Sequence, residues 1–244
     1  MSSLIRSDQP RGRAAVHALR GILNALFPPL TLSVHRLLLA LAATASAVVA
    51  VLTVLVKSNP HLQIDASIER WIQAINWGPL TLTFPFFSWI GGPGGIYMQV
   101  GALVLVLLLN RRAWLLALAA TAGGFSYFLL VSFVNRPRPS VGEVLRVTEH
   151  PGASSFPSGH VIFITISVGL LMLCIGYRYL PRWARPIGWA VAASIVTTAA
   201  ISRIYVGAHW PTDVLASGTI ALGWLALVSS VNWISNRAFY KDAD

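Results

Sequence analysis

The chain has 244 residues, of which 55% are hydrophobic and only 11% are charged, and its mean hydropathy is +0.66. Soluble domains carry about 25% charged residues, so this composition excludes an ordinary soluble domain and indicates an integral membrane protein. The net charge of +10 would also suit a nucleic-acid-binding protein, but the cations are dispersed among loops on two sides of the expected membrane. They form no single stripe, which argues against nucleic acid as a partner and favours anionic lipid headgroups.

The first 35 residues are predicted to form a basic N-terminal arm on the cytoplasmic side. Their apolar part, from Ile22 to Val34, is interrupted by Pro28-Pro29, and proline breaks a helix. This pattern favours an interfacial or disordered arm over a cleaved signal peptide.

Six uncharged apolar runs follow, each close to the roughly 20 residues that a helix needs to cross a bilayer core of about 30 Å. The sequence therefore predicts an all-α, polytopic membrane protein, a six-transmembrane-helix bundle over residues 36–234 with a cytoplasmic tail at 235–244. The expected spans are Leu37 to Val56, about Gly92 to Leu109, Ala113 to Val134, Val161 to Tyr177, Ile187 to Ile201 and Val214 to Val231.

A shorter amphipathic segment lies between the first two spans. Apolar residues recur at helical spacing from Ile64 to Trp77, with Asp65, Glu69 and Arg70 between them. This periodicity predicts a helix on the outer membrane surface.

The distribution of cations predicts the orientation, because Lys and Arg in short loops are retained in the cytoplasm. With the N-terminus inside, 12 of the 18 Lys and Arg residues fall in inner segments and the other 6 in outer ones. We therefore expect both termini in the cytoplasm, in what is most simply a bacterial plasma membrane.

Three short polar segments stand where apolar runs begin or end, and in this topology all three meet the outer interface. They are Asn135-Arg136-Pro137-Arg138-Pro139, then Pro157-Ser158-Gly159-His160, then Ser202-Arg203 followed by His209 and Asp213. Their convergence predicts an extracytoplasmic active site.

Each segment has a chemical interpretation and a plainer one. Ser158 and Gly159 stand at a helix start, where free N–H groups bind anions, although a simple N-cap would look the same. His209 and Asp213 have a spacing at which the carboxylate could hold one imidazole nitrogen and leave the other free to attack, although such pairs also serve as caps. Arg138 and Arg203 suit phosphate oxygens, or could be interfacial residues that snorkel.

Taken together, the Arg138-Pro139 pair and the second and third segments resemble the three signature motifs of the type 2 phosphatidic acid phosphatases, also called lipid phosphate phosphatases. That family is related to the vanadium haloperoxidases. The resemblance covers about residues 36–233, and it implies a six-helix membrane bundle with an extracytoplasmic site.

The resemblance also implies roles for individual residues. His209 would attack phosphorus to form a phosphohistidine, oriented by Asp213, and His160 would protonate the leaving oxygen. The transition-state charge would be met by Arg138, Arg203, Ser158 and the Gly159 N–H, within motifs that also contain Pro157 and Ser202. Family members need no metal or other cofactor.

One position departs from the family pattern. The first motif opens with a lysine seven residues before its arginine, and that position here is Val131. Arg136 and Arg146 are candidate substitutes because they lie in the adjoining loop. The missing lysine also keeps open two alternatives, a phosphotransferase with a lipid or sugar acceptor and a degenerate lipid-phosphate-binding protein.

The sequence thus predicts a lipid phosphatase acting on a polyprenyl pyrophosphate, phosphatidate or phosphatidylglycerophosphate at the outer leaflet. A transporter or channel would be favoured by ionisable residues at mid-membrane, and the centres of the predicted spans contain none. The oligomeric state is left open.

Overall fold

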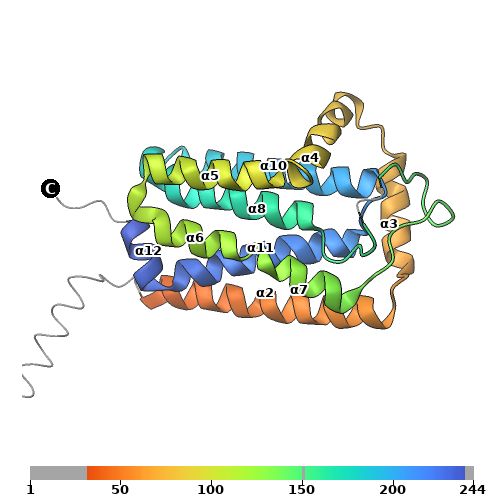
Figure 1. The fold of residues 1–244 in the computed structure, drawn as a ribbon, viewed down its shortest axis with the longest axis horizontal. Helices are drawn as coiled ribbons and strands as arrows, with labels where there is room; N and C mark the ends of the chain where they lie inside the picture. The colour runs from red at the N-terminus through yellow and green to blue at the C-terminus, as the bar shows by residue number, and fades with distance from the viewer. Residues whose placement is uncertain (1–31, 150–151, 240–244) are drawn as a thin grey trace, which may run out of the picture.

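The computed structural model describes residues 32–149 and 152–239, and this part of the chain is built from helices joined by short connections and one long loop (Figure 1). The expected N-terminal arm and the end of the C-terminal tail lie largely outside these residues. The α-helices of three or more turns along the bundle are α2 (Leu32–Ser58), α5 (Gly95–Leu109), α8 (Gly159–Leu171), α10 (Arg185–Tyr205) and α11 (Pro211–Ser230). The shorter elements are α3 (Gln63–Ala74), η1 (Gly78–Thr83), α4 (Phe84–Gly91), η2 (Arg111–Ala113), α6 (Trp114–Ala122), α7 (Phe125–Val134), η3 (Met172–Gly176), α9 (Tyr177–Tyr179) and α12 (Asn232–Phe239).

Five stretches of the described chain are long and apolar enough to cross a membrane, and a bent helix pair brings the total to six. The chain is therefore an integral membrane protein, as its composition predicts. The unbroken spans are Val34–Ser58, Arg111–Val134, Gly159–Tyr179, Arg185–Tyr205 and Pro211–Ser230. Each of them begins and ends within a few residues of the expected run.

The second expected span is a broken one. The helices Gly78–Gly91 and Gly95–Leu109 together have the hydropathy of a span but meet at an angle of 79°. The break falls at Gly92, Pro93 and Gly94, where proline removes a backbone donor and glycine allows a sharp change of direction. The expected run from about Gly92 to Leu109 therefore covers only the second of these helices, and its start falls at the bend.

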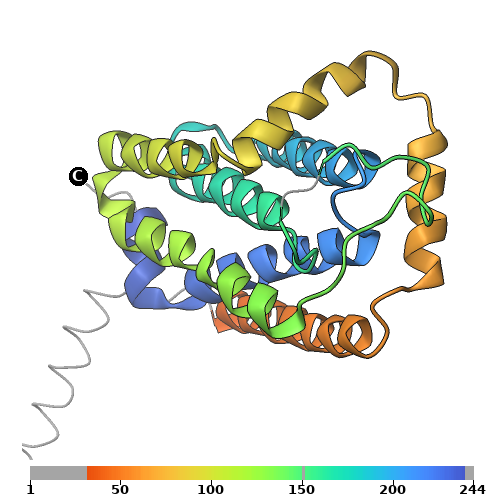
Figure 2. The same ribbon diagram turned by 45° about the vertical axis from the view of Figure 1, so that its right-hand side comes forward.

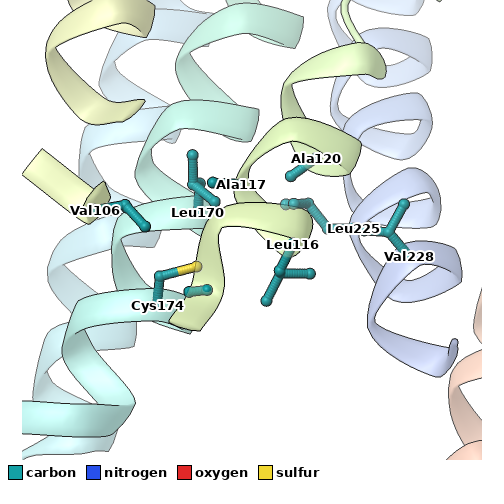
Figure 3. Close-up of a cluster of buried hydrophobic side chains, with 9 residues drawn as sticks. Val106, Leu116, Ala117, Ala120, Leu170, Cys174, Leu225 and Val228 are labelled. Atoms are coloured by element: carbon teal, nitrogen blue, oxygen red, sulfur yellow. The ribbon is translucent and has the colours of Figure 1, made fainter. Parts of the chain in front are cut away.

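The main apolar core lies next to α12, whose Ile234 packs against it, and Figure 3 shows its buried side chains. Side chains from α5, α6, α8 and α11 meet there, and Leu116, Leu170 and Cys174 are almost completely buried. Cys174 packs as a small apolar side chain in this cluster. This packing holds the helices together far from the polar motifs.

The opposite end of the bundle is covered by α3 and by the long loop between α7 and α8 (Figures 1 and 2). The helix expected between the first two spans is confirmed as α3, and it crosses the ends of the long helices. Its polar side chains Asp65, Glu69 and Gln73 are buried against the protein, while Ile64 and Trp71 are exposed. The polar face of α3 is therefore directed inward.

Candidate active site

The three polar segments come together at the end of the bundle covered by α3. The rings of His160, at the start of α8, and His209, before α11, lie 6.3 Å apart between centroids. Arg138, from the α7–α8 loop, places Nη1 3.4 Å from Nε2 of His209. Residues separated by up to 71 positions in sequence thus lie together at one site.

His209 is held by a backbone carbonyl. Its Nδ1 lies 2.6 Å from the oxygen of Ser155, and because a carbonyl can only accept, Nδ1 carries the hydrogen. Nε2 therefore carries the lone pair, which accepts a long contact of 3.4 Å from Arg138 Nη1. Burial lowers the pKa of His209 well below 6.5, and the charges of Arg138 and His160 lower it further. The ring is neutral at physiological pH, as a nucleophile requires.

Asp213 does not make the hydrogen bond to His209 that the sequence spacing suggests. Its Oδ2 lies 3.9 Å from Nδ1, and the same oxygen accepts from the Trp210 N–H at 2.9 Å. Its Oδ1 accepts from Arg136 at 2.6 Å. Asp213 caps the first turn of α11 and fixes the backbone that carries His209, whereas Ser155 fixes the imidazole tautomer.

His160 packs against α4, the first helix of the broken second span. Its Nε2 lies 3.1 Å from the Ser88 carbonyl oxygen, so this nitrogen carries a hydrogen. A Cβ added at Gly91 would lie 2.5 Å from Cδ2 of the ring. Only glycine allows the α4 backbone to approach the imidazole this closely.

Arg138 is fixed by backbone carbonyls on both sides of the pocket. It donates to Gly152 and Ser154, each at 2.6 Å, and to Ala208 at 2.5 Å. Burial lowers the pKa of the Arg138 guanidinium, an effect that Asp213 opposes, and the guanidinium keeps its charge. The planar guanidinium of Arg138 therefore holds the α7–α8 loop in place and presents one edge to His209.

Arg203 is completely buried near the end of α10 and is paired with a carboxylate from the long loop. Its Nη1 donates to Glu149 Oε2 at 2.8 Å, its Nη2 donates to the Ser88 hydroxyl, and its Nε contacts the Ser202 hydroxyl at 3.2 Å. Ser88 also donates to Glu149 at 2.5 Å. The Glu149 carboxylate thus contacts the guanidinium of Arg203, which the sequence predicts to bind phosphate.

The start of α8 has the features of an anion site. The Ser158 N–H donates to the Ser217 hydroxyl of α11 at 2.7 Å, while its own buried Oγ has no hydrogen-bond partner among the described residues. A Cβ at Gly159 would lie 3.1 Å from the Tyr127 ring. The preceding Phe156–Pro157 peptide bond is cis. Ser158 Oγ and the free N–H groups of the first turn are suited to bind an oxyanion.

Arg136 lies outside the phosphate pocket. Its side chain is completely buried between Asp65 and Asp213, at 2.7 and 2.6 Å, and its Nε donates to the Pro60 carbonyl at 2.9 Å. With a further bond to Thr212 at 2.7 Å, four of its five N–H groups are engaged by the protein. This position does not fit a substitute for the missing lysine.

Arg146, the other candidate substitute, is also engaged elsewhere. It stacks on the ring of Tyr205, 4.1 Å from the centroid, and contacts the Gln73 carbonyl at 3.4 Å.

Several residues at the site were not singled out from the sequence. They are Asp65, Ser88, Glu149, Ser155 and Ser217, which act through backbone carbonyls, hydroxyls or buried ion pairs. Only Asp65 left a signal, because Asp65, Glu69 and Gln73 recur every four residues and mark a polar helix face.

Comparison with known proteins gives a consistent result. The model of the PAP2 superfamily matches residues 112–238. An undecaprenyl-diphosphatase of Sulfolobus acidocaldarius is 26% identical over 139 residues, which cover 55% of this chain and 62% of that protein. A decaprenylphosphoryl-5-phosphoribose phosphatase of Mycobacterium tuberculosis is 30% identical over 146 residues, which cover 57% and 76%.

A solved structure has a similar fold. The transmembrane PAP2-type phosphatidylglycerolphosphate phosphatase of Bacillus subtilis superposes with a TM-score of 0.60 at 20% identity, over 76% of this chain and 92% of that one.

Proposed function

Because this chain belongs to the PAP2 superfamily, we propose that it is a membrane phosphatase that hydrolyses a lipid phosphomonoester or pyrophosphate. The observation that carries the proposal is the setting of His209. Its Nδ1–H is directed to the Ser155 carbonyl and its Nε2 lone pair faces the Arg138 guanidinium, so a phosphoryl group bound by arginine would meet a free nucleophile.

In the first step, Nε2 of His209 forms a bond to phosphorus while the bond from phosphorus to the leaving oxygen breaks. His160, protonated on both nitrogens beside the bound phosphate, keeps its Nε2 hydrogen on the Ser88 carbonyl and gives its Nδ1 proton to that oxygen, which leaves as a lipid alcohol or, from a pyrophosphate, as a lipid phosphate. Arg138, Arg203, Ser158 and the Gly159 N–H bind the three remaining oxygens, whose charge must be stabilised in the transition state.

In the second step, a water oxygen attacks the phosphohistidine on phosphorus and the phosphorus–nitrogen bond breaks. His160, now without its proton, accepts one from the water, which restores both histidines and releases inorganic phosphate. Each step uses the same pair of rings, whose centroids lie 6.3 Å apart.

We assign the substrate to the polyprenyl class. The two curated relatives are named for polyprenyl-linked phosphates. Beside His160, a cavity of about 360 Å³ is lined by Gly91, Gly92, Phe125, Phe128 and other residues of the second and third spans. Its mainly apolar lining suits the tail of a lipid whose headgroup lies at the histidines.

The site is assigned to the extracytoplasmic side, with both termini in the cytoplasm. Support comes from the distribution of cations along the sequence, since 12 of the 18 Lys and Arg residues fall in segments expected on the cytoplasmic side. The reaction is proposed to be metal-independent. Within the described residues no group of three His, Cys, Asp or Glu side chains is placed to hold a metal ion, and two guanidiniums supply the positive charge.

The test is phosphate release by the purified full chain from a panel of polyprenyl and glycerol lipid phosphates, with and without acceptor alcohols. We expect hydrolysis that a chelator does not affect and that vanadate inhibits. His209→Ala should abolish it, while His61→Ala, at a side chain 56% exposed and outside the site, should not. Transfer to an acceptor without phosphate release, or an active His209→Ala, would refute the proposal.

A further inference from the structure

The inward face of α3 is connected to the nucleophile through buried polar contacts. Asp65 lies on this face and is completely buried. One of its carboxylate oxygens accepts from the Thr212 N–H at 2.9 Å, and the other accepts from the Thr212 hydroxyl at 2.7 Å. Thr212 is in the first turn of α11, where backbone N–H groups lack helical partners. Asp65 therefore caps a helix to which it does not belong.

A third contact of Asp65, to Arg136, leads to the turn that carries His209. Its Oδ2 lies 2.7 Å from Arg136 Nη2, and Nη1 of the same guanidinium lies 2.6 Å from Asp213. Asp213 in turn accepts from the N–H of Trp210, the residue that follows His209. Two carboxylates thus share one guanidinium, and all three side chains are 0–1% exposed.

This arrangement constrains the position of His209. Water does not compete for these buried groups, so their geometry is set by their partners alone. With Asp65 in place, the Arg136 guanidinium bonds to a carboxylate on each side, which fixes the orientation in which it contacts Asp213. Without it, Arg136 and Thr212 each lose a partner and the turn carrying His209 is fixed from one side.

We propose that Asp65 is a positioning residue for the reaction, which holds the His209 turn in line with the bound phosphoryl group through Arg136 and Thr212. This inference rests on the proposed phosphatase function. It assigns a part in catalysis to α3, a helix outside the residues 112–238 matched by the family model. It also gives Arg136 the role of a bridge between two carboxylates.

The experiment compares Asp65→Asn with Glu69→Gln in the purified full chain, using the lipid phosphate that the unmodified protein hydrolyses fastest. Glu69 is the matched control because it is buried one turn along the same face, and none of its hydrogen bonds reaches Arg136 or Thr212. Inhibition by vanadate and by inorganic phosphate is measured for each protein. Vanadate takes the five-coordinate geometry that includes a bond to His209, whereas phosphate contacts the arginines and Ser158 without that bond.

For Asp65→Asn we expect kcat to fall by about tenfold or more and vanadate inhibition to weaken by about the same factor. KM and phosphate inhibition should stay within about threefold of the parent, because the arginines remain in place. Asp65→Glu, which keeps the charge, should recover part of kcat. Glu69→Gln should match the parent in all four quantities.

An Asp65→Asn protein with kcat within about threefold of the parent would overturn the inference. Equal weakening of vanadate and phosphate would also overturn it, because that result indicates general loosening of the fold. If Asp65→Asn does not fold, Thr212→Val decides in the same way, since it removes the hydroxyl that bonds to both Asp65 and Arg136 without changing charge. An unmodified protein that hydrolyses no lipid phosphate would instead refute the proposed function, and the inference would fall with it.

Discussion

Replacing Ser217 by alanine should destabilise the protein by leaving a buried donor at the start of α8 without its acceptor. The Ser217 hydroxyl accepts from the Ser158 N–H at 2.7 Å and donates to the Asp213 carbonyl at 2.6 Å. Both serines are completely buried. The hydroxyl thus joins α8 to α11 beside the histidines.

The expected size follows from these contacts. A net hydrogen bond contributes about 1 kcal/mol, and a buried donor without a partner costs about 1–3 kcal/mol. The Asp213 carbonyl also serves as a helical acceptor within α11, so its loss adds little. We therefore expect a decrease of about 1–3 kcal/mol in the free energy of unfolding.

The assay is equilibrium unfolding of the purified protein in mixed micelles by increasing SDS fraction, followed by circular dichroism. Thr219→Ala is the control, because Thr219 is on the same helix but is only half-buried, and its hydroxyl makes a solvent-exposed bond to the Leu215 carbonyl of its own preceding turn. It should change stability by less than about 0.5 kcal/mol. Ser217→Thr, which keeps a hydroxyl, should recover part of the loss. If Ser217→Ala and Thr219→Ala unfold at the same SDS fraction, the reasoning is wrong.

Three further predictions concern charge and positioning. Burial keeps the pKa of His209 well below 6.5, and the neutral ring is the reactive form. As pH falls to 6.5, kcat/KM should therefore not decline through protonation of His209. A decline that is traced to this ring near its ordinary pKa would contradict the assignment. Burial, with the charges of Asp213 and Asp65, raises the pKa of Glu69 from 4.5 to about 9. Between these two values the folded protein keeps a proton on Glu69 that the unfolded chain loses. The free energy of unfolding should therefore fall as pH rises from 4.5 toward 9. Glu69→Gln should flatten that pH dependence in SDS unfolding, and an unchanged slope would count against a protonated Glu69. Arg138→Lys should lower kcat about tenfold or more, because an ammonium group cannot replace a guanidinium that donates to three carbonyls. Steady-state kinetics on the best substrate would measure this change. Full activity of the variant would exclude the proposed role of Arg138.

The spans and the motifs could be predicted from the sequence because both depend on local patterns. Hydropathy located the uncharged runs, since a bilayer requires about 20 apolar residues in a helix regardless of what packs beside it. The motif histidines and arginines stood at the ends of those runs, so placing the runs also placed His160 and His209 on one face. The amphipathic period from Ile64 likewise predicted α3.

The contacts within the site were decided by tertiary structure. The spacing of His209 and Asp213 suggested a direct hydrogen bond, yet a backbone carbonyl from Ser155, 54 residues earlier, occupies Nδ1. No residue pattern encodes a carbonyl, because every residue has one. Arg136 belonged to the right segment for a phosphate ligand, but its side chain turns toward Asp65 on a helix whose position only the packed bundle defines.

What the sequence alone determined is therefore which residues are candidates for the chemistry and that they lie at the same end of the predicted spans, because hydropathy and charge act along the chain. Which side chain contacts which partner was decided only when α3, the long loop, α8 and α11 packed together. Buried ion pairs and hydrogen bonds depend on distances of a few ångströms between segments far apart in sequence, and a linear pattern contains no such distances.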